Sequence, residues 1–524
     1  MHQALQIPEI IRTILEGSNT KKALAVALTC RAFLEPGLDR VWHTLRGFTE
    51  IVSCFPEDLC EVERRDVRGL NGNPTVEVEV LVLRRALKVA DLERYLTKYS
   101  HRIRVFTGIN TRLFFLSNEV SQALQMATEY RPGALSPHLE TFYWPFFAQQ
   151  YETYYGRECS AMVSAFVPLL LSSTVASFCL PYFEIVQPIT STTIQLALSR
   201  LRLTKLNVLT GAHVSWVQEV LQGPLGNQLR NLRLNIVTSP QLLVCVKALP
   251  QLRYLHLGVV GNLLPLNAAL TTELTIPFPS LLNFTFFAKD YSKVAAILEL
   301  IPTTNGIRHL GFTVDNPGIK DEVRETIDII RVRMNPWTLA SLRWVERGGP
   351  RQAPQTVPID VDIHGSVDIS PLFLFKNLTR FKISIQEPVQ LSPNQVDQIP
   401  LAWPTIQSLK VRSPGRNHLA PLIDYEHILS LIDGCRSLRK LSLPFDTTRL
   451  AGNETSPGAP YSLETLQVDD CPIYSPTRVV AFLKANFRKT TTITRQTPED
   501  AGERSLFCQR WDIVEKEWAA YCST

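Results

Sequence analysis

The chain repeats one short hydrophobic pattern along most of its length: an apolar residue, two others, a second apolar residue, one other, and a third apolar residue. The clearest copies begin at Leu229, Leu252, Leu438 and Leu463. Weaker copies begin at Leu139, Val175, Leu203, Leu281, Ile307, Leu339, Leu378 and Ile406. Successive copies start 23 to 39 residues apart. A pattern that recurs at such intervals is typical of a solenoid, in which stacked repeats share one continuous core and expose a long binding surface.

Each copy predicts a short strand, and helical periodicity between copies appears at Asp290–Glu299, Asp321–Val332 and His427–Ile432. The copy at Leu463 continues to Cys471, the position at which a leucine-rich repeat has Asn or Cys to satisfy backbone groups of the turn. An ordinary buried small residue is the other interpretation of Cys471. The sequence therefore predicts an α/β leucine-rich-repeat solenoid, a horseshoe with strands inside and helices outside, over residues 139–490.

Three short helices are predicted in the first 45 residues. In the first, Pro8 suits the first helical turn, and apolar residues from Ile7 to Leu15 fall on one face. The second runs from Thr20 to Cys30 and the third from Phe33 to Trp42. Three helices of this size enclose little core, so a partner surface is expected.

These helices resemble the F-box, through the segments Leu5–Ile11 and Thr29–Phe33 together with Leu24, Leu28, Leu38 and Trp42. The closest likeness is to F-box proteins of mushroom-forming fungi, which continue into irregular leucine-rich repeats. The resemblance implies a substrate receptor of a cullin–RING ubiquitin ligase, which docks on a Skp-type adaptor and through it on the cullin. The adaptor-binding residues that it implies are Ile7, Pro8, Ile10, Ile11, Ile14, Leu24, Leu28 and Trp42.

Two positions depart from the F-box pattern. Phe33 stands where many members have Trp, and Lys21 and Lys22 occupy a turn that more often carries an acidic residue and Pro. A helical cap on the solenoid is the alternative interpretation of these helices. A leucine-rich-repeat scaffold without ligase coupling is the corresponding alternative function.

The remaining segments complete the predicted organisation: F-box 1–45, packing region with irregular first repeats 46–138, solenoid 139–490 and C-terminal cap 491–524. In the packing region, Thr75–Leu83 predicts a strand and Asp91–Tyr99 a helix. Near the end, a helix is expected at Arg478–Phe487, and Phe507–Tyr521 places Trp511, Val514 and Trp518 on one face. Exposed loops are expected at Arg347–Pro358 and Thr447–Pro460.

Composition narrows the compartment and the partners. Lys and Arg number 54 against 49 acidic residues, and this net charge of +5 does not indicate nucleic-acid binding. No apolar run is long enough for a membrane span, and Pro8 and Glu9 interrupt any secretory signal. The ten cysteines form no C-x-x-C pair, which favours a reducing compartment. A cytoplasmic or nuclear protein is expected.

The sequence carries no recognisable catalytic motif for phosphate binding, dinucleotide binding, zinc proteolysis or a serine nucleophile. We therefore predict a non-enzymatic protein with no catalytic residue, metal or cofactor. One metal alternative is Asp360, Asp362 and His364, with Asp368 nearby, because alternation would place the first three on one strand face. A half-exposed strand explains the same alternation.

Basic residues gather beside the apolar triplets, at positions that strand alternation turns away from the core. They are Lys205, Arg233, His256, Arg343, Arg380, Lys382, Lys410, Arg412 and Lys440. Among the sequence positions next to the last two residues of each triplet, Asp469 is the only acidic residue. Chance combined with solvation is the alternative explanation of this set. The sharper hypothesis is a substrate site for an acidic or phosphorylated segment, because Arg and Lys hold carboxylates and phosphates. Its predicted residues are Arg343, Arg380, Lys382, Lys410, Arg412 and Lys440.

Overall fold

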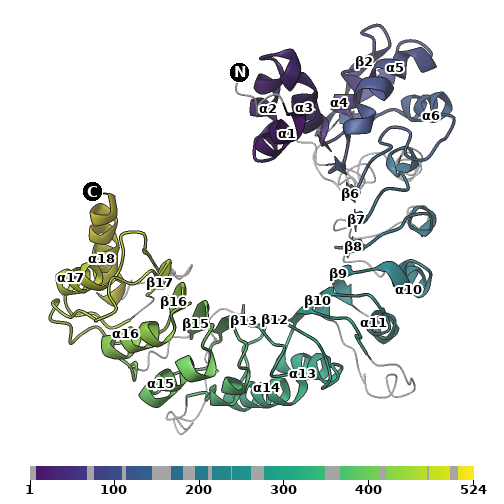
Figure 1. Cartoon of the computed structure of the whole chain (residues 1–524). Coiled ribbons are helices and arrows are strands. Elements are labelled where there is room, and N and C mark those ends of the chain that lie inside the picture. The colour runs from purple at the N-terminus through teal and green to yellow at the C-terminus, as the bar shows by residue number, and fades with distance from the viewer. Residues whose placement is uncertain are drawn as a thin grey trace. The chain divides into compact units, whose positions relative to one another are not determined.

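The structure is a computed structural model of the whole chain (Figure 1). It describes residues 7–67, 76–108, 114–143, 167–180, 195–209, 215–237, 239–260, 277–347, 366–413, 420–468, 471–495 and 506–523. The chain divides into two compact units, Met1–Leu252 and Arg253–Thr524. Each unit combines helices with a run of parallel strands.

The first unit begins with three packed helices, α1 (Pro8–Glu16), α2 (Thr20–Ala27) and α3 (Arg31–Trp42). Pro8 lies in the first turn of α1, and the Asn19 side chain accepts a hydrogen bond from the Lys22 amide at the start of α2. Ile11, Leu15 and Ala23 form the buried centre of the bundle. The three predicted helices are thus present, with α2 ending earlier than expected.

The bundle leads directly into the parallel strands. The first of these strands, β1 (Thr44–Leu45), follows α3 after one residue and pairs with β4. The strands that follow in register order are β4 (Val105–Phe106), β6 (Thr141–Tyr143), β7 (Ser177–Leu180), β8 (Lys205–Val208) and β9 (Asn231–Val237). Phe106, Phe142 and Phe178 align across three of them, and their rings contact each other in the core. The helices of this part are α10 (Ser215–Gln222), η4 (Gly226–Gln228) and α11 (Pro240–Lys247).

A second, smaller sheet lies within residues 46–138. It contains β2 (Cys60–Val67), β3 (Val76–Leu83) and β5 (Phe114–Leu116) in the order β2-β3-β5. The helices around it are α4 (Thr49–Val52), α5 (Val89–Lys98), η3 (Ser100–Arg102) and α6 (Asn118–Ala127). The predicted strand and helix correspond to β3 and α5, whereas β2 was not predicted because charged residues fill it.

The second unit stacks parallel strands in chain order. They are β10 (Tyr254–Val260), β11 (Asn283–Ala288), β12 (His309–Val314), β13 (Ser341–Glu346), β14 (Arg380–Ser384), β15 (Ser408–Arg412), β16 (Lys440–Ser442), β17 (Thr465–Gln467) and β18 (Thr492–Thr494). Its helices are α13 (Tyr291–Glu299), α14 (Lys320–Arg333), η5 (Ser370–Leu374), α15 (Pro393–Ala402), α16 (Tyr425–Gly434), α17 (Pro476–Asn486) and α18 (Leu506–Ser523). Figure 1 shows α13 to α16 along one side of β11 to β16, so the other side of these strands, here called the strand face, faces away from the helices.

The twelve predicted triplets fall on the strands β6 to β17, one triplet per strand. Every described triplet residue is buried; Trp144 lies outside the described residues. The predicted α/β architecture of stacked parallel strands and helices is therefore confirmed. Cys471, after the last triplet, is buried and its thiol donates to the Leu443 carbonyl at 3.8 Å, as a turn-satisfying residue would.

Helix α18 covers the strands next to it with the face that its sequence predicts. Trp511, Val514 and Trp518 are buried, and each Trp Nε1 donates to a backbone carbonyl at 2.8 Å, of Cys471 and Thr491 respectively. Apolar contact and a satisfied indole N–H together make this helix a fixed part of the second unit.

Candidate functional site

The N-terminal helices leave several of their large apolar residues exposed. Along α1, Ile11 and Leu15 point into the bundle, whereas Ile10 and Ile14, one position earlier, lie on its surface. At the end of α2, the capping residue Leu28 is 75% exposed although it follows directly after the buried Ala27. The apolar stripe is wider than the bundle can cover, so part of it is left in solvent. Isolated exposed apolar residues are ordinary, but several on one small bundle make it a candidate interaction surface.

Six of the eight predicted adaptor-binding residues belong to this surface, here called the apolar surface: Ile7, Pro8, Ile10, Ile14, Leu24 and Leu28. Two do not. Ile11 is only 4% exposed and belongs to the bundle core, and Trp42 stacks on Tyr99 with ring centroids 4.3 Å apart. Ile11 is used to hold the three helices together, and Trp42 attaches α3 to the packing region that follows. Leu34, 39% exposed on α3, was not predicted.

A buried arginine fixes the bundle to that region. The Arg102 guanidinium, from η3, forms ion pairs with Glu35 and Asp39 of α3 and also donates to the Lys98 carbonyl at 2.9 Å. Its side chain is 7% exposed, so these charge-assisted bonds act in a largely desolvated setting. The amides of Arg104 and Val105 both donate to the carbonyl of His43. The apolar surface is thereby held in one orientation on the first strands.

Three cations lie in register on neighbouring strands of the second unit. Arg343 of β13 is opposite Lys382 of β14, and Lys382 is opposite Lys410 of β15. Neighbouring strands are about 4.8 Å apart, so the three Cα atoms span roughly 10 Å. All three project from the strand face, because the residues before and after each are buried core residues. We call Arg343, Lys382 and Lys410 the basic row.

The charges of the basic row are mutually unfavourable. Partial burial, followed by the nearby charges of Arg343, Lys410 and Arg412, lowers the pKa of the Lys382 ammonium. Within the described residues, neither Arg343 nor Lys382 forms an ion pair. Glu346, the acidic residue of β13, points to the helical side of the sheet. Its negative charge therefore does not offset the cations on the strand face.

Glu346 is instead buried in a hydrogen-bonded cluster behind the sheet. It accepts from the Tyr291 hydroxyl, from the Gly318 amide at 3.1 Å and from the Gln386 amide at 2.6 Å. Burial, with the adjacent Glu346 carboxylate, raises the pKa of Tyr291, so its hydroxyl stays protonated and donates. Trp344 Nε1 donates to the same hydroxyl at 3.1 Å. This cluster satisfies Glu346 and stiffens the strand that carries Arg343.

The other three predicted substrate residues surround the basic row less closely. Arg380 precedes Lys382 by two residues on the same side of β14, and Arg412 follows Lys410 by two residues on β15. Lys440 lies on β16 opposite Ser408, and its Nζ is 4.0 Å from the Glu464 carboxylate. Lys440 therefore has an acidic partner beside it.

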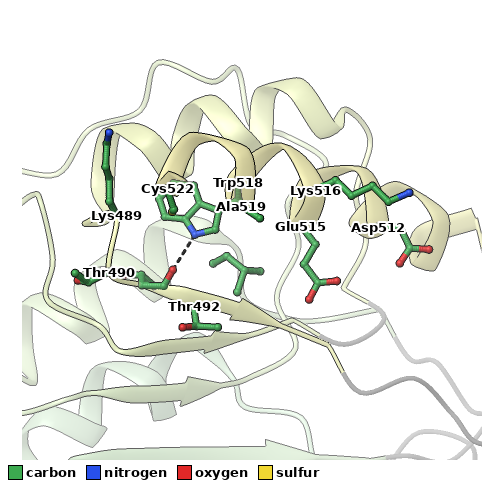
Figure 2. A pocket seen from close by; sticks show the side chains of 11 residues that line it. Lys489, Thr490, Thr492, Asp512, Glu515, Lys516, Trp518, Ala519 and Cys522 are labelled. Atoms are coloured by element: carbon green, nitrogen blue, oxygen red, sulfur yellow. Dashed lines mark hydrogen bonds between the residues drawn. The ribbon is translucent and has the colours of Figure 1, made fainter. Parts of the chain in front are cut away.

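Two further features lie apart from the apolar surface and the basic row. An open hollow of about 520 Å³ lies between β18 and α18, where Figure 2 shows Glu515 directed from the helix toward the strand. Trp518 and Thr491 close one end of it, and Arg495 pairs with Asp512 at the other. The hollow belongs to the packing of α18 on the last strand, and its charged side chains do not converge on one point.

The metal alternative stays a hypothesis, because three of its four residues fall outside the described ranges. Asp360, Asp362 and His364 lie outside them, as does Asp469. Asp368 accepts from the Ser370 amide and from Gln395 Nε2, which gives it a structural role. Across the described ranges, no three His, Cys, Asp or Glu residues approach closely enough to share a metal ion.

Comparison with known proteins leaves the function to be argued from these surfaces. No protein-family model matches the chain, and no curated protein matches it. In the part of the chain that the structure describes, none of the helices has the length and hydropathy to cross a membrane.

Proposed function

We propose that this protein is the substrate-recognition subunit of a Skp–cullin–F-box ubiquitin ligase. The N-terminal helices are its F-box and dock on the Skp-type adaptor, which connects them to the cullin. The stacked strands and helices are leucine-rich repeats that hold the protein substrate. The chain itself performs no chemistry in this scheme; it raises the local concentration of substrate at the catalytic subunits, which act in the cytoplasm or nucleus.

The apolar surface carries the proposal. The three-helix bundle leaves five large apolar side chains in water, and a partner that covers them would gain the free energy of their burial. They are Ile7, Ile10, Ile14, Leu24 and Leu28. Each such side chain contributes about 1.5–3 kcal/mol when it is fully buried. The Arg102 clamp adds support, since a receptor that positions substrates benefits from a docking surface held rigidly on its repeats.

The decisive experiment measures adaptor affinity after charge is placed on the apolar surface. Ile14→Glu combined with Leu28→Glu should weaken binding of a recombinant Skp-type adaptor by at least about 100-fold, because two buried apolar contacts are lost and each 1.4 kcal/mol is tenfold. Isothermal titration calorimetry gives the affinity, and far-UV circular dichroism should be unchanged because both side chains are exposed.

Val332→Glu with Leu401→Glu is the matched control, since these residues are equally exposed on α14 and α15. It should bind the adaptor like the parent chain. Unchanged affinity of the Ile14 and Leu28 variant would contradict the assignment of the surface. If the parent chain binds no adaptor, the alternative function is favoured, a leucine-rich-repeat scaffold without ligase coupling. The departure from the F-box pattern at Lys21 and Lys22 is the sequence feature that supports this alternative.

A further inference from the structure

We infer that the basic row binds one phosphate group, the phosphoserine or phosphothreonine of an extended peptide, between Arg343, Lys382 and Lys410. That this peptide is part of a ubiquitination substrate rests on the proposed function. The binding itself does not, because it depends only on the strand face of the second unit.

The basic row is bounded on both sides. At the same register position, the preceding strands carry Thr285 and Gly311, and the following strands carry Ser442 and Gln467. Cations therefore occupy three neighbouring strands and then stop. A polynucleotide needs cations repeated along its backbone, whereas this arrangement has the extent of a single anionic group.

The spacing favours one phosphate over a run of carboxylates. Same-side residues of an extended peptide are about 6.6–6.8 Å apart, which does not match the roughly 4.8 Å between strands. Lys and Arg side chains are long enough to converge from three adjacent strands on one point above Lys382. A phosphate monoester carries about −1.5 to −2 charge and three acceptor oxygens, one for each cation, whereas a carboxylate carries a single charge.

The surroundings of the row leave space for this group. Gly311 has no side chain beside Arg343, and a Cβ there would lie 3.2 Å from the Thr285 Cγ2 and 3.8 Å from the Arg343 Cβ. On the other flank, the small Ser442 allows Lys410 Nζ to reach Gln467 Oε1 at 3.5 Å. Short side chains or none thus flank the three long cations on both sides.

The partial burial of Lys382 explains why an anion is needed. Its ammonium is half removed from water and faces two cations of the row, and Glu346 of β13 is directed behind the sheet. A dianion bound above Lys382 would offset the repulsion among the three cations, with Lys410 turning from Gln467 toward it. Arg380 and Arg412, two residues away along the strands, extend the positive field toward a peptide that enters from either side.

The experiment compares three fluorescein-labelled peptide libraries on the full chain. Each has four degenerate positions on both sides of a fixed centre, which is phosphoserine, glutamate or serine. Fluorescence anisotropy at physiological salt should give the phosphoserine library an affinity at least about tenfold above the glutamate library. Arg343→Gln/Lys382→Gln/Lys410→Gln should lower phosphoserine affinity by on the order of 10- to 100-fold or more. Inorganic phosphate should compete, and chloride at equal ionic strength should not.

A matched control carries the same loss of charge on the helical side, in Arg324→Gln/Arg331→Gln/Arg436→Gln, and should bind like the parent chain. Arg343→Lys should retain part of the affinity, because it keeps the charge and loses the planar fork. Equal affinity for the glutamate library would overturn the phosphate assignment, as would tighter binding of a short single-stranded oligonucleotide or full phosphopeptide binding by the glutamine variant. Adaptor affinity measured on the same proteins separates failure of this site from failure of the proposed function.

Discussion

Gly37 shows how one residue permits the N-terminal bundle to close. A Cβ at this position of α3 would lie 2.5 Å from the Ala27 Cβ and 2.9 Å from the Ala27 Cα on α2. The two helices therefore touch backbone to backbone, and Ala23 and Ala27 form the facing side of α2. This close approach turns the larger neighbours Leu24 and Leu28 outward. Small buried residues between α2 and α3 thus determine which larger side chains form the apolar surface.

We expect Gly37→Ala to destabilise the bundle by about 1–3 kcal/mol, because the added methyl group overpacks the α2–α3 contact despite its better helix propensity. Amide hydrogen exchange in α2 and α3 measures this as a fall in the free energy of local opening. Gly17→Ala is the control: a Cβ there meets nothing within 4 Å, so its effect should be neutral or slightly stabilising. Unchanged protection in the Gly37 variant would show that α2 and α3 pack more loosely.

Residue patterns predicted these surfaces only in part. Helical spacing correctly groups Ile10, Ile11 and Ile14 as one apolar stripe, but it cannot say which of them the other helices cover. Strand alternation does predict that Arg343, Lys382 and Lys410 share a face, because two-residue periodicity fixes orientation. It cannot predict their alignment, which depends on the register between strands far apart in sequence.

At the scale of elements, the apolar triplet is a strong predictor because three buried residues anchor each strand. The strands β1, β4 and β18 join the same kind of pairing without a triplet, since each has one buried residue, Leu45, Phe106 and Ile493. Their pairing is imposed by the neighbouring strand, which the local sequence does not reveal. Helix α18 was predictable for the opposite reason, because Trp511 and Trp518 seven residues apart define one face.

Removal of α18 by truncation after residue 505 should unfold the last strands. Trp511 and Trp518 would leave an uncovered apolar face, and the carbonyls of Cys471 and Thr491 would lose their indole donors. Loss of one buried Trp commonly costs about 3–5 kcal/mol, so a lower melting temperature or aggregation is expected in differential scanning calorimetry. Ile513→Ala, at an exposed position of the same helix, should change stability by less than about 0.5 kcal/mol. A soluble truncated chain with the parent melting temperature would rule out the capping role.

At the scale of the whole molecule, the stacked parallel strands within each unit follow one another in chain order and pair with their neighbours in that order, and the described helices contact their neighbours in the same way. Stability in such an array is a sum of local terms with nearest-neighbour coupling. A defect should therefore spread over a few strands and leave distant ones intact. This locality would let the apolar surface and the basic row be altered independently.

Phe142→Ala tests this locality. Phe142 packs between Phe106 and Phe178, with ring centroids 5.3 and 5.7 Å away, so its loss should cost about 3–5 kcal/mol near β4, β6 and β7. Hydrogen exchange followed by mass spectrometry should show faster exchange in those strands and unchanged protection in β13 to β15. The reciprocal variant, Phe381→Ala on β14, should expose β13 to β15 and weaken anion binding at Lys382 while α1 to α3 keep their protection. If either substitution lowers protection equally along the whole chain, the repeats unfold as one cooperative body and the two surfaces cannot be separated by mutation.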